Sequence, residues 1–156
     1  MDPTKNGLSP AERQVIAEIR AMRASPDRDM HKAIIDDPAA VMYHFIVTSR
    51  GHVDLRLAPI ARELGAGMKK LQRSFKKKYK MSMLRCQLEA RLNFSKYLLR
   101  IYPERKISSI ASKIGYNEVR DFNHFFRNQT QQSPTEWLHK AHEGLDNTQL
   151  PSDDDE

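Results

Sequence analysis

Residues 60–65, Ile-Ala-Arg-Glu-Leu-Gly, recur 50 positions later as Ile-Ala-Ser-Lys-Ile-Gly at residues 110–115. Each copy is followed by an apolar pair at i,i+4 spacing, Leu71 with Phe75 and then Phe122 with Phe126. A small residue in one helix, a glycine in the turn and an apolar pair on one face of the next helix are typical of a helix-turn-helix. The repeat therefore predicts two helix-turn-helix units.

The charge of the chain is concentrated around this repeat. The 156 residues carry a net charge of +6, but residues 56–140 hold 19 Lys/Arg and 6 Asp/Glu, a net of +13, and the remainder is net −7. A basic middle with acidic flanks favours a polyanionic partner such as nucleic acid, whereas an ordinary solvated surface would mix the two signs more evenly.

The densest run of cations falls within the second expected helix of the first unit. Helical periodicity turns Leu71 and Phe75 inward. Five cations then point outward and repel one another: Lys69, Lys70, Arg73, Lys76 and Lys77. Phosphate groups would relieve that repulsion. The run comprises Lys69, Lys70, Arg73, Lys76, Lys77, Lys78 and Lys80, with no acidic residue between them.

Capping residues and apolar periodicity predict an all-α chain, and no segment shows convincing strand alternation. Ser9, Asp27, Asp37 and Ser133 are expected helix caps. Helices are expected at residues 10–24, 28–35, 38–49, 57–64, 68–79, 82–100, 106–114, 118–128 and 134–140. The domain prediction is an N-terminal helical extension at 1–37, a double helix-turn-helix domain at 38–140 with a long linker helix, and an acidic, disordered tail at 141–156.

Two helices carry further expectations. The apolar stripe of the first helix has two interpretations, an added wall of the core or a contact with a partner or a second copy; it consists of Val15, Ile16, Ile19 and Met22. On the long helix, helical spacing brings Leu84, Leu88, Leu92, Ser95 and Leu99 to one side.

Several classes of protein are disfavoured. No run of about 18 apolar residues is present, and the first 30 residues lack the apolar core of a secretory signal. Cys86 is the only cysteine, so neither an intramolecular disulfide nor a zinc site built on several cysteines is expected. His139 and His142 lack an evident third metal ligand. We therefore expect no enzyme, metal or cofactor, and a cytoplasmic, nucleoid-associated location.

Residues 57–140 resemble the DNA-binding domain of AraC/XylS-type bacterial transcription regulators. The resemblance covers a little over half of the chain. Each matching motif is weak by itself, and the resemblance is strong because all of the motifs occur in order at the family spacing. The matching pieces are Leu57-x-x-Ile60-Ala61-x-x-Leu64-Gly65, Leu71-x-Arg73-x-Phe75-Lys76, Arg91, Leu98-Leu99, Ile110-Ala111-x-x-x-Gly115-Tyr116, Phe122-x-x-x-Phe126-Arg127 and Ser133-Pro134-x-Glu136-Trp137.

The chain departs from the family pattern at five positions. Gly67 replaces the usual serine cap of the first recognition helix, and Cys86 replaces a common aromatic residue. Lys80 and Gln131 stand where the family usually has glycine after each recognition helix, and His124 replaces a common arginine. These differences concern sequence preference more than fold.

The resemblance implies that recognition helices at about 68–79 and 118–128 enter successive major grooves of DNA. The linker helix, about 28 Å long at about 1.5 Å per residue, would hold them near the groove spacing of about 34 Å. The expected base-reading residues are Lys69, Gln72, Arg73, Arg120, Asp121, Asn123 and His124, and the expected phosphate-binding residues are Lys70, Lys76, Lys77 and Arg127. Asp121 could instead be a charge partner of its helix N-terminus, and His124 a merely exposed side chain.

The leading prediction is a sequence-specific transcription regulator that binds double-stranded DNA. By resemblance alone it would be an activator that contacts RNA polymerase. Because the first unit has more cations and the Gln72/Arg73 pair, we expect it to dominate affinity. Two alternatives remain: a helix-turn-helix-derived factor that binds another regulator, and a non-specific DNA-binding protein.

Overall fold

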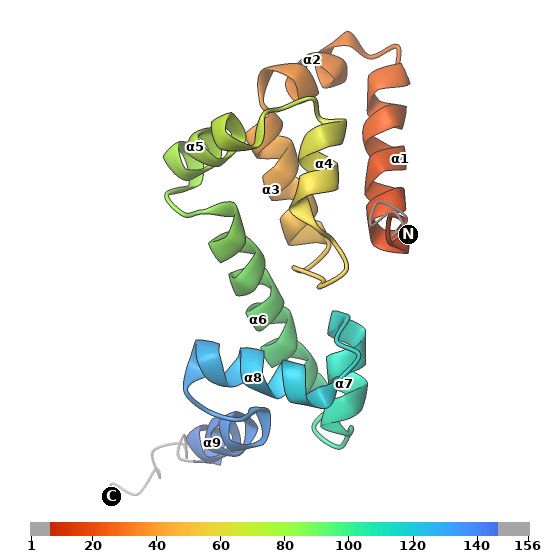
Figure 1. Ribbon diagram of the computed structural model, residues 1–156. Coiled ribbons are helices and arrows are strands. Elements are labelled where there is room, and N and C mark those ends of the chain that lie inside the picture. The colour runs from red at the N-terminus through yellow and green to blue at the C-terminus, as the bar shows by residue number, and fades with distance from the viewer. Residues whose placement is uncertain (1–6, 147–156) are drawn as a thin grey trace, which may run out of the picture. The chain divides into compact units, whose positions relative to one another are not determined.

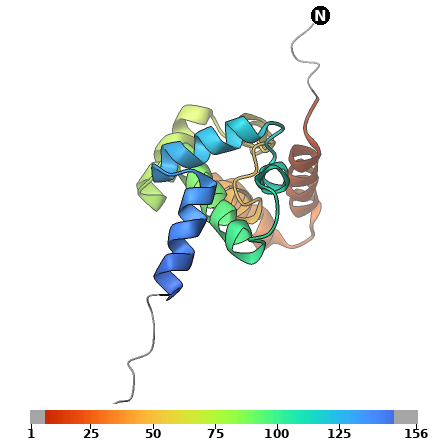
Figure 2. The same ribbon diagram turned by 90° about the horizontal axis from the view of Figure 1, so that it is seen from below.

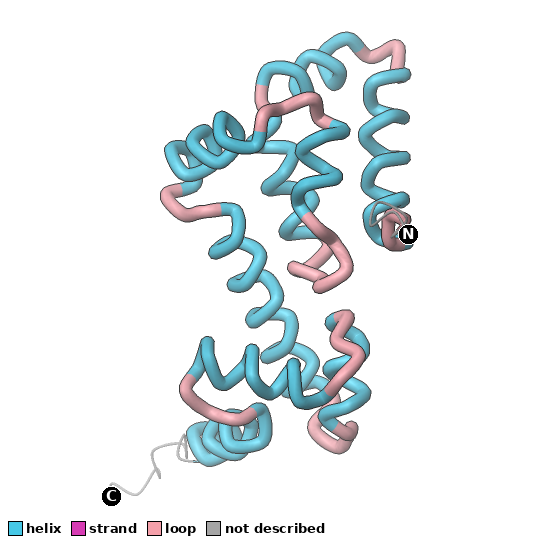
Figure 3. The backbone as a smooth tube through the Cα atoms, in the orientation of Figure 1, coloured by secondary structure: helices cyan, strands magenta, loops and turns pink. Residues whose placement is uncertain are grey.

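The computed structural model describes residues 7–146 and is built from helices alone within that range (Figures 1 and 3). This confirms the predicted fold class. The helices are α1 Pro10–Ala24, α2 Arg28–Asp36, α3 Pro38–Thr48, α4 Leu57–Glu63, α5 Met68–Tyr79, α6 Met83–Ile101, α7 Ile107–Ile114, α8 Val119–Thr130 and α9 Pro134–Asp146. Within the same residues, no helix is long and apolar enough to cross a membrane.

The chain divides into two compact units whose boundary lies inside α6. Unit 1 extends to Asn93 and contains α1–α5 with the first part of α6; unit 2 begins at Phe94 and contains the rest of α6 with α7–α9. In unit 2, α8 and α9 are joined by a short turn and run in clearly different directions (Figure 2).

The expected caps begin four of the helices, and at α2 the amide of Asp29 donates to Asp27 Oδ1 at 3.0 Å. Ser9 and Glu12 form a capping box, in which the Glu12 amide donates to Ser9 Oγ and the Ser9 amide donates to the Glu12 carboxylate, each at 3.1 Å. Ser133 and Glu136 make the same reciprocal pair of hydrogen bonds at the start of α9, again at 3.1 Å. Asp37 accepts from the amide of Ala40 at 3.0 Å. Such side chains satisfy amides that the first turn of a helix leaves unpaired.

Two helices continue further than expected. α8 ends at Thr130 and not at Asn128, and α9 continues past Lys140 to Asp146. Extending an existing helix costs little per residue, and Gly144 is tolerated inside it at about 1 kcal/mol. His139 Nδ1 lies 3.3 Å from Glu143 Oε1 across one turn of this extension. Of the tail predicted to be disordered, residues 147–156 lie outside the described residues.

The stripe of α1 is part of the core of unit 1. Val15, Ile16 and Ile19 are buried in the same apolar cluster as Ile34 of α2. The interpretation of this stripe as a wall of the core is therefore confirmed. The fully buried large side chains of this unit also include Met42, Phe45, Ile46, Leu55, Ile60 and Phe75.

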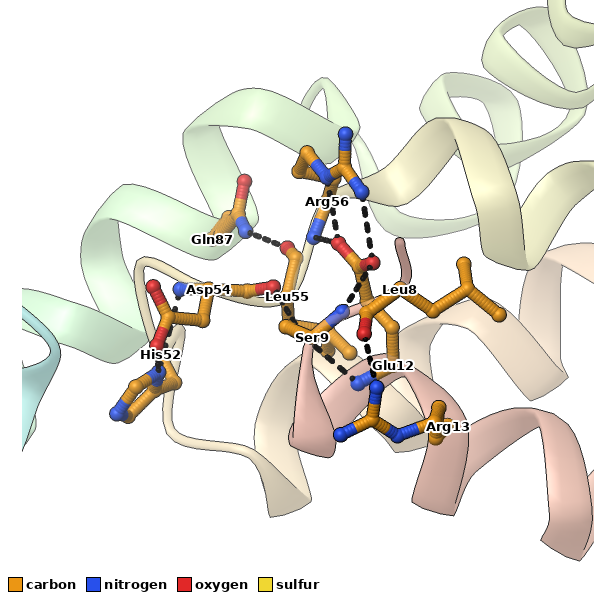
Figure 4. A network of polar contacts seen from close by, with 9 residues as sticks. All are labelled: Leu8, Ser9, Glu12, Arg13, His52, Asp54, Leu55, Arg56 and Gln87. Atoms are coloured by element: carbon orange, nitrogen blue, oxygen red, sulfur yellow. Dashed lines mark hydrogen bonds and ion pairs between the residues drawn. The ribbon is translucent and has the colours of Figure 1, made fainter. Parts of the chain in front are cut away.

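Glu12 ties α1 to the segment that precedes α4 (Figure 4). Its carboxylate accepts from the Arg56 amide at 3.0 Å, from Arg56 Nε at 2.7 Å and from Nη2 at 2.9 Å, in addition to the Ser9 amide. Ser9 Oγ donates to the Asp54 carbonyl at 2.7 Å, and Gln87 Nε2 of α6 donates to the Leu55 carbonyl at 2.8 Å. The start of α4 is thereby held from two sides.

Gly51 follows the end of α3 and allows a close approach to α6. Its φ is +66°, and a Cβ placed there would lie 2.3 Å from the Gln87 carbonyl oxygen and 2.7 Å from the Arg91 amide nitrogen. Arg91 Nε donates to the Gly51 carbonyl at 2.7 Å. Only glycine fits this contact between two backbones.

The five residues expected on one side of α6 do not form one buried stripe. Leu84 is 61% exposed, Leu88 and Leu92 are half-buried, and only Ser95 and Leu99 are buried. The burial of this side changes along the helix because α6 serves two cores. Unit 1 buries Met83, Cys86 and Gln87, and unit 2 buries Ser95, Leu98 and Leu99.

The core of unit 2 is aromatic. Phe122 and Phe126 are fully buried, and Trp137 of α9 meets Phe126 edge-on with ring centroids 6.0 Å apart. Lys96 Nζ and Arg100 Cζ of α6 lie over the Trp137 ring, 5.5 and 4.9 Å from its centroid. Trp137 thus closes the core and also contacts cations of α6.

Candidate nucleic-acid interface

The two units contain the same helix-turn-helix down to its backbone hydrogen bonds. In the first, the amide of Ala66 donates to the Ala61 carbonyl at 3.2 Å; in the second, the amide of Tyr116 donates to the Ala111 carbonyl at 3.0 Å. Gly65 and Gly115 both have left-handed backbone angles, with φ of +69° and +100°. The sequence repeat is therefore a structural repeat of α4–α5 and α7–α8.

The second helices of the two motifs, α5 and α8, correspond residue by residue at an offset of 51. Both contain 12 residues, beginning at Met68 and Val119. Both end in a left-handed residue that is not glycine, Lys80 with φ +60° and Gln131 with φ +63°. The first helices repeat at an offset of 50, so the second motif has one more residue in its turn.

At this offset, six of the seven expected base-reading residues are counterparts of one another, and Asp121 corresponds to Lys70. Lys69 corresponds to Arg120, Gln72 to Asn123 and Arg73 to His124. Lys76 likewise corresponds to Arg127. Both helices therefore present a carboxamide between cationic or titratable side chains.

All of the expected contact residues are exposed. On α5 these are Lys69, Lys70, Gln72, Arg73, Lys76 and Lys77; on α8 they are Arg120, Asp121, Asn123, His124 and Arg127. The inward faces are buried, with Leu71 and Phe75 at 2% and 0% exposure. Each helix thus has one face that holds its unit together and one that is free to meet a ligand.

Lys78 is a cation of α5 whose role sequence reasoning missed. Its ammonium forms a short ion pair with the carboxylate of Asp37, the cap of α3. The hydrogen bond between them raises the pKa of Lys78 and lowers the pKa of Asp37. The cap itself was readable from Asp37-Pro38, but a partner 41 positions away leaves no local signal in the sequence.

α5 and α8 differ in charge at their N-termini. Neither Gly67 nor Glu118, their capping residues, makes a side-chain capping hydrogen bond. The first turn of α8 contains Asp121, which complements the positive end of the helix dipole, whereas α5 has no acid there. On α8, Arg127 Nη2 also lies 3.9 Å from Glu136 Oε1, so part of its charge is balanced within the protein.

Two helix-turn-helix motifs, each presenting an exposed polar helix that carries cations, define a helix-turn-helix protein of the DNA-binding class. A family model described as a helix-turn-helix domain matches residues 60–140. The chain belongs to this family, the AraC-type helix-turn-helix proteins, and its fold is that of a DNA-binding transcription regulator.

Two solved structures are similar to the chain. One is the C-terminal domain of AraT, a response regulator from Geobacillus stearothermophilus, with 19% sequence identity, coverage of 96% of this chain and 93% of that chain, and a TM-score of 0.56. The other is a DNA-binding transcriptional dual regulator from Escherichia coli K-12, with 25% identity, coverage of 65% and 95%, and a TM-score of 0.52. The first shares the fold over nearly the whole chain. No curated protein matches the sequence.

Proposed function

We propose that the chain is a sequence-specific transcription regulator that inserts α5 and α8 into successive major grooves of double-stranded DNA. The observation that carries this proposal is the matched, exposed face of the two helices, with cations at Lys69 and Arg120 and carboxamides at Gln72 and Asn123. A helix of this kind fits the major groove, where each base pair presents a distinct pattern of donors and acceptors.

The side chains divide into base-reading and phosphate-binding groups. Gln72 and Asn123 suit the donor–acceptor edge of adenine, and Arg73 suits the two acceptors of guanine. Lys69, Arg120, Asp121 and His124 complete the base-reading face. Contacts to phosphates position the protein without reading sequence, and we assign them to Lys70, Lys76, Lys77 and Arg127.

The long helix sets the spacing in this proposal. α6 has 19 residues, or about 28 Å at about 1.5 Å per residue, close to the spacing of about 34 Å between successive major grooves on one face of DNA. A single chain would then bind an asymmetric site without a second copy. Unit 1 contributes most of the affinity, because α5 carries more cations and no acid on its exposed face.

The proposed regulatory role is supported only by the resemblance to the family. We propose an activator that acts on DNA in the bacterial cytoplasm, at the nucleoid, and contacts RNA polymerase while bound. The apolar stripe of α1 is buried, so a contact of α1 with a partner or a second copy would use the opposite, exposed face.

A selection from random-sequence DNA at about 150 mM salt tests the proposal. We expect enrichment of a motif in two halves about ten base pairs apart. Binding without enrichment would indicate a non-specific DNA-binding protein. An absence of binding even at low salt, where phosphate contacts are strongest, would leave a factor that binds another protein.

Two substitutions on α5 test the division of roles. Arg73→Ala should lose preference at particular bases, at a cost of about 1–3 kcal/mol, whereas Lys77→Ala should weaken all sequences alike and lower the salt dependence by about one charge. Equal, sequence-independent losses in both variants would contradict the assignment.

A further inference from the structure

A pocket of unit 1 lies apart from the face assigned to DNA. α1 makes its most extensive contacts with α2 and α4, and α3 with α5, which leaves a space between α1 and α3. The volume of this pocket is about 350 Å³, within the range of about 300–1,000 Å³ that is typical of small-molecule sites. None of the described residues that line it belongs to α5.

The floor of the pocket is apolar. Val15 of α1, Phe45 of α3 and Leu55 of the segment before α4 line it, and each is at most 8% exposed. All three also belong to the apolar cluster of unit 1. The floor is therefore a surface that the core already holds in place, and an apolar group can bind to it without reorganising the protein.

The walls of the pocket are rich in hydrogen-bond acceptors. Thr48 Oγ1 and Ser49 Oγ each donate to a carbonyl of α3, at 2.8 and 3.1 Å, so both hydroxyls have used their hydrogen and keep their lone pairs. On the wall formed by α1, Gln14 Nε2 donates to Glu18 Oε1 at 3.4 Å. The carboxamide oxygen of Gln14 and the carboxylate of Glu18 can still accept. These walls suit a ligand with several N–H donors.

The charge of the walls favours a cationic ligand. The chain contains 26 lysines and arginines, but none is among the described residues that line the pocket, whereas Glu18 is. The two imidazoles of the walls are His44 and His52, and His52 Nδ1 accepts from the amide of Asp54 at 3.2 Å. An ammonium group at Glu18 would combine an ion pair with charge-assisted hydrogen bonds.

We propose that this pocket binds a small amphipathic amine, with its apolar body on the floor and its ammonium group against Glu18. This site goes beyond the proposed function, because no residue assigned to DNA lines it. The occupant contacts the segment that holds α4 in place, since the Leu55 carbonyl accepts from Gln87 and the next residue, Arg56, is the capping residue of α4. Binding therefore stabilises unit 1 in proportion to ligand concentration.

The test uses 2-phenylethylamine, an ammonium group on a short apolar body, and titrates it into the full chain at pH 8. Chemical shifts of the backbone amides locate the site and give the affinity, and thermal unfolding measures the stabilisation. We expect saturable binding with a dissociation constant of about 1 mM or lower, the largest shifts at residues of the pocket, and a melting temperature that rises with probe concentration. 2-Phenylethanol, which is similar in size but uncharged, should bind about fivefold more weakly.

Three variants separate the carboxylate from the apolar floor. Glu18→Gln should weaken binding of the amine about fivefold and leave binding of the alcohol unchanged. Glu104→Gln is the matched control, because it removes the same charge from an exposed position of unit 2. Ala11→Leu enlarges a side chain that lines the pocket and should abolish binding of both probes. Circular dichroism checks that the variants keep their helices.

The inference is overturned if 2-phenylethylamine fails to bind at about tenfold the expected dissociation constant, or if the largest shifts fall outside the pocket. Equal affinity for the amine and the alcohol, or equal behaviour of Glu18→Gln and Glu104→Gln, would also overturn it. None of these measurements uses DNA, so their outcome is independent of the proposed function.

Discussion

The carboxylate of Glu12 is a buried charge in unit 1. Its side chain has no exposed surface, and a buried carboxylate is costly unless it is hydrogen-bonded and paired. Four donors meet that need, one from Ser9 and three from Arg56. Because Arg56 is the capping residue of α4, the pairing fixes α1 directly to the first helix of the helix-turn-helix.

Replacing Glu12 with glutamine should destabilise unit 1 by about 2 kcal/mol. The charge-assisted hydrogen bonds are lost, and the NH2 group of glutamine would face the N–H donors of Ser9 and Arg56. Native-state hydrogen exchange of amides in α1 and α4 measures the change. Glu18→Gln is the matched control, because Glu18 is exposed on the same helix. Equal exchange rates in the two variants would contradict the role of Glu12.

The same carboxylate should make unit 1 sensitive to acid. The hydrogen bond from the Arg56 side chain, opposed by burial, holds the pKa of Glu12 below its ordinary value of 4.5. A carboxyl group whose pKa is lowered by folding stabilises the fold at pH values above its ordinary pKa. That stabilisation is lost as the pH falls through the folded-state pKa. The stability difference between the original chain and Glu12→Gln should therefore shrink below about pH 4.5. Denaturant unfolding across pH 3–7 measures it, and a constant difference would refute the linkage.

Two glycines with nearly equal backbone angles should respond very differently to alanine. Gly65→Ala meets no atom within 4 Å, so it should cost only the left-handed backbone term of about 1–2 kcal/mol. Gly51→Ala meets the backbone of Gln87 at 2.3 Å and must also displace α6, so its cost should exceed that of Gly65→Ala by at least about 1 kcal/mol. Thermal unfolding of both variants tests the order, and similar losses would rule out the close approach.

At the scale of the element, neighbouring cations of α5 point to different surroundings. Lys78 lies against Asp37 and links α5 to the cap of α3, whereas Lys77 is exposed on the face assigned to DNA. The sequence shows these residues only as neighbours in one basic run. Which cation belongs to the fold and which is available to a ligand depends on where α3 packs.

This division predicts opposite effects for neighbouring alanine substitutions. Lys78→Ala should lower the melting temperature of unit 1 and leave the salt dependence of DNA binding nearly unchanged. Lys77→Ala should leave the melting temperature unchanged and reduce the salt dependence by about one charge. Thermal unfolding and binding titrations over a range of salt concentrations measure both effects. A loss of salt dependence in Lys78→Ala as large as that in Lys77→Ala would show that Lys78 also contacts DNA.

At the scale of the whole molecule, α6 is the one helix that both units share. Its residues up to Asn93 belong to unit 1, and those from Phe94 belong to unit 2. In the proposed complex, this helix converts two separate half-site preferences into one preference with fixed spacing.

Breaking α6 at the boundary should uncouple the half-sites. Asn93 is exposed within the helix, and proline there removes a backbone hydrogen bond and costs about 3 kcal/mol. Asn93→Pro should still enrich each half-site in a selection experiment but accept variable spacing between them. Asn93→Ala, the matched control, should keep the spacing fixed. Retention of a fixed spacing in the proline variant would contradict the proposed role of α6.

The sequence by itself determined the helices, the two motifs and the exposed polar faces of α5 and α8. Caps such as Ser9 and Ser133 and pairs such as Leu71 with Phe75 act between residues within a turn or two of each other, so the chain records them locally. The same locality explains the errors at the ends of α8 and α9, where no strong stop signal marks the last turn.

Only the tertiary structure decided which distant groups meet. Glu12 pairs with Arg56, 44 positions away in the sequence, and Lys78 pairs with Asp37, 41 positions away. The need for glycine at position 51 arises from the close approach of the α6 backbone. The exposure of Leu84 likewise depends on which side of α6 the first core covers. These contacts are set by the directions in which helices pack, and helical periodicity shows that a face is apolar without showing what will cover it.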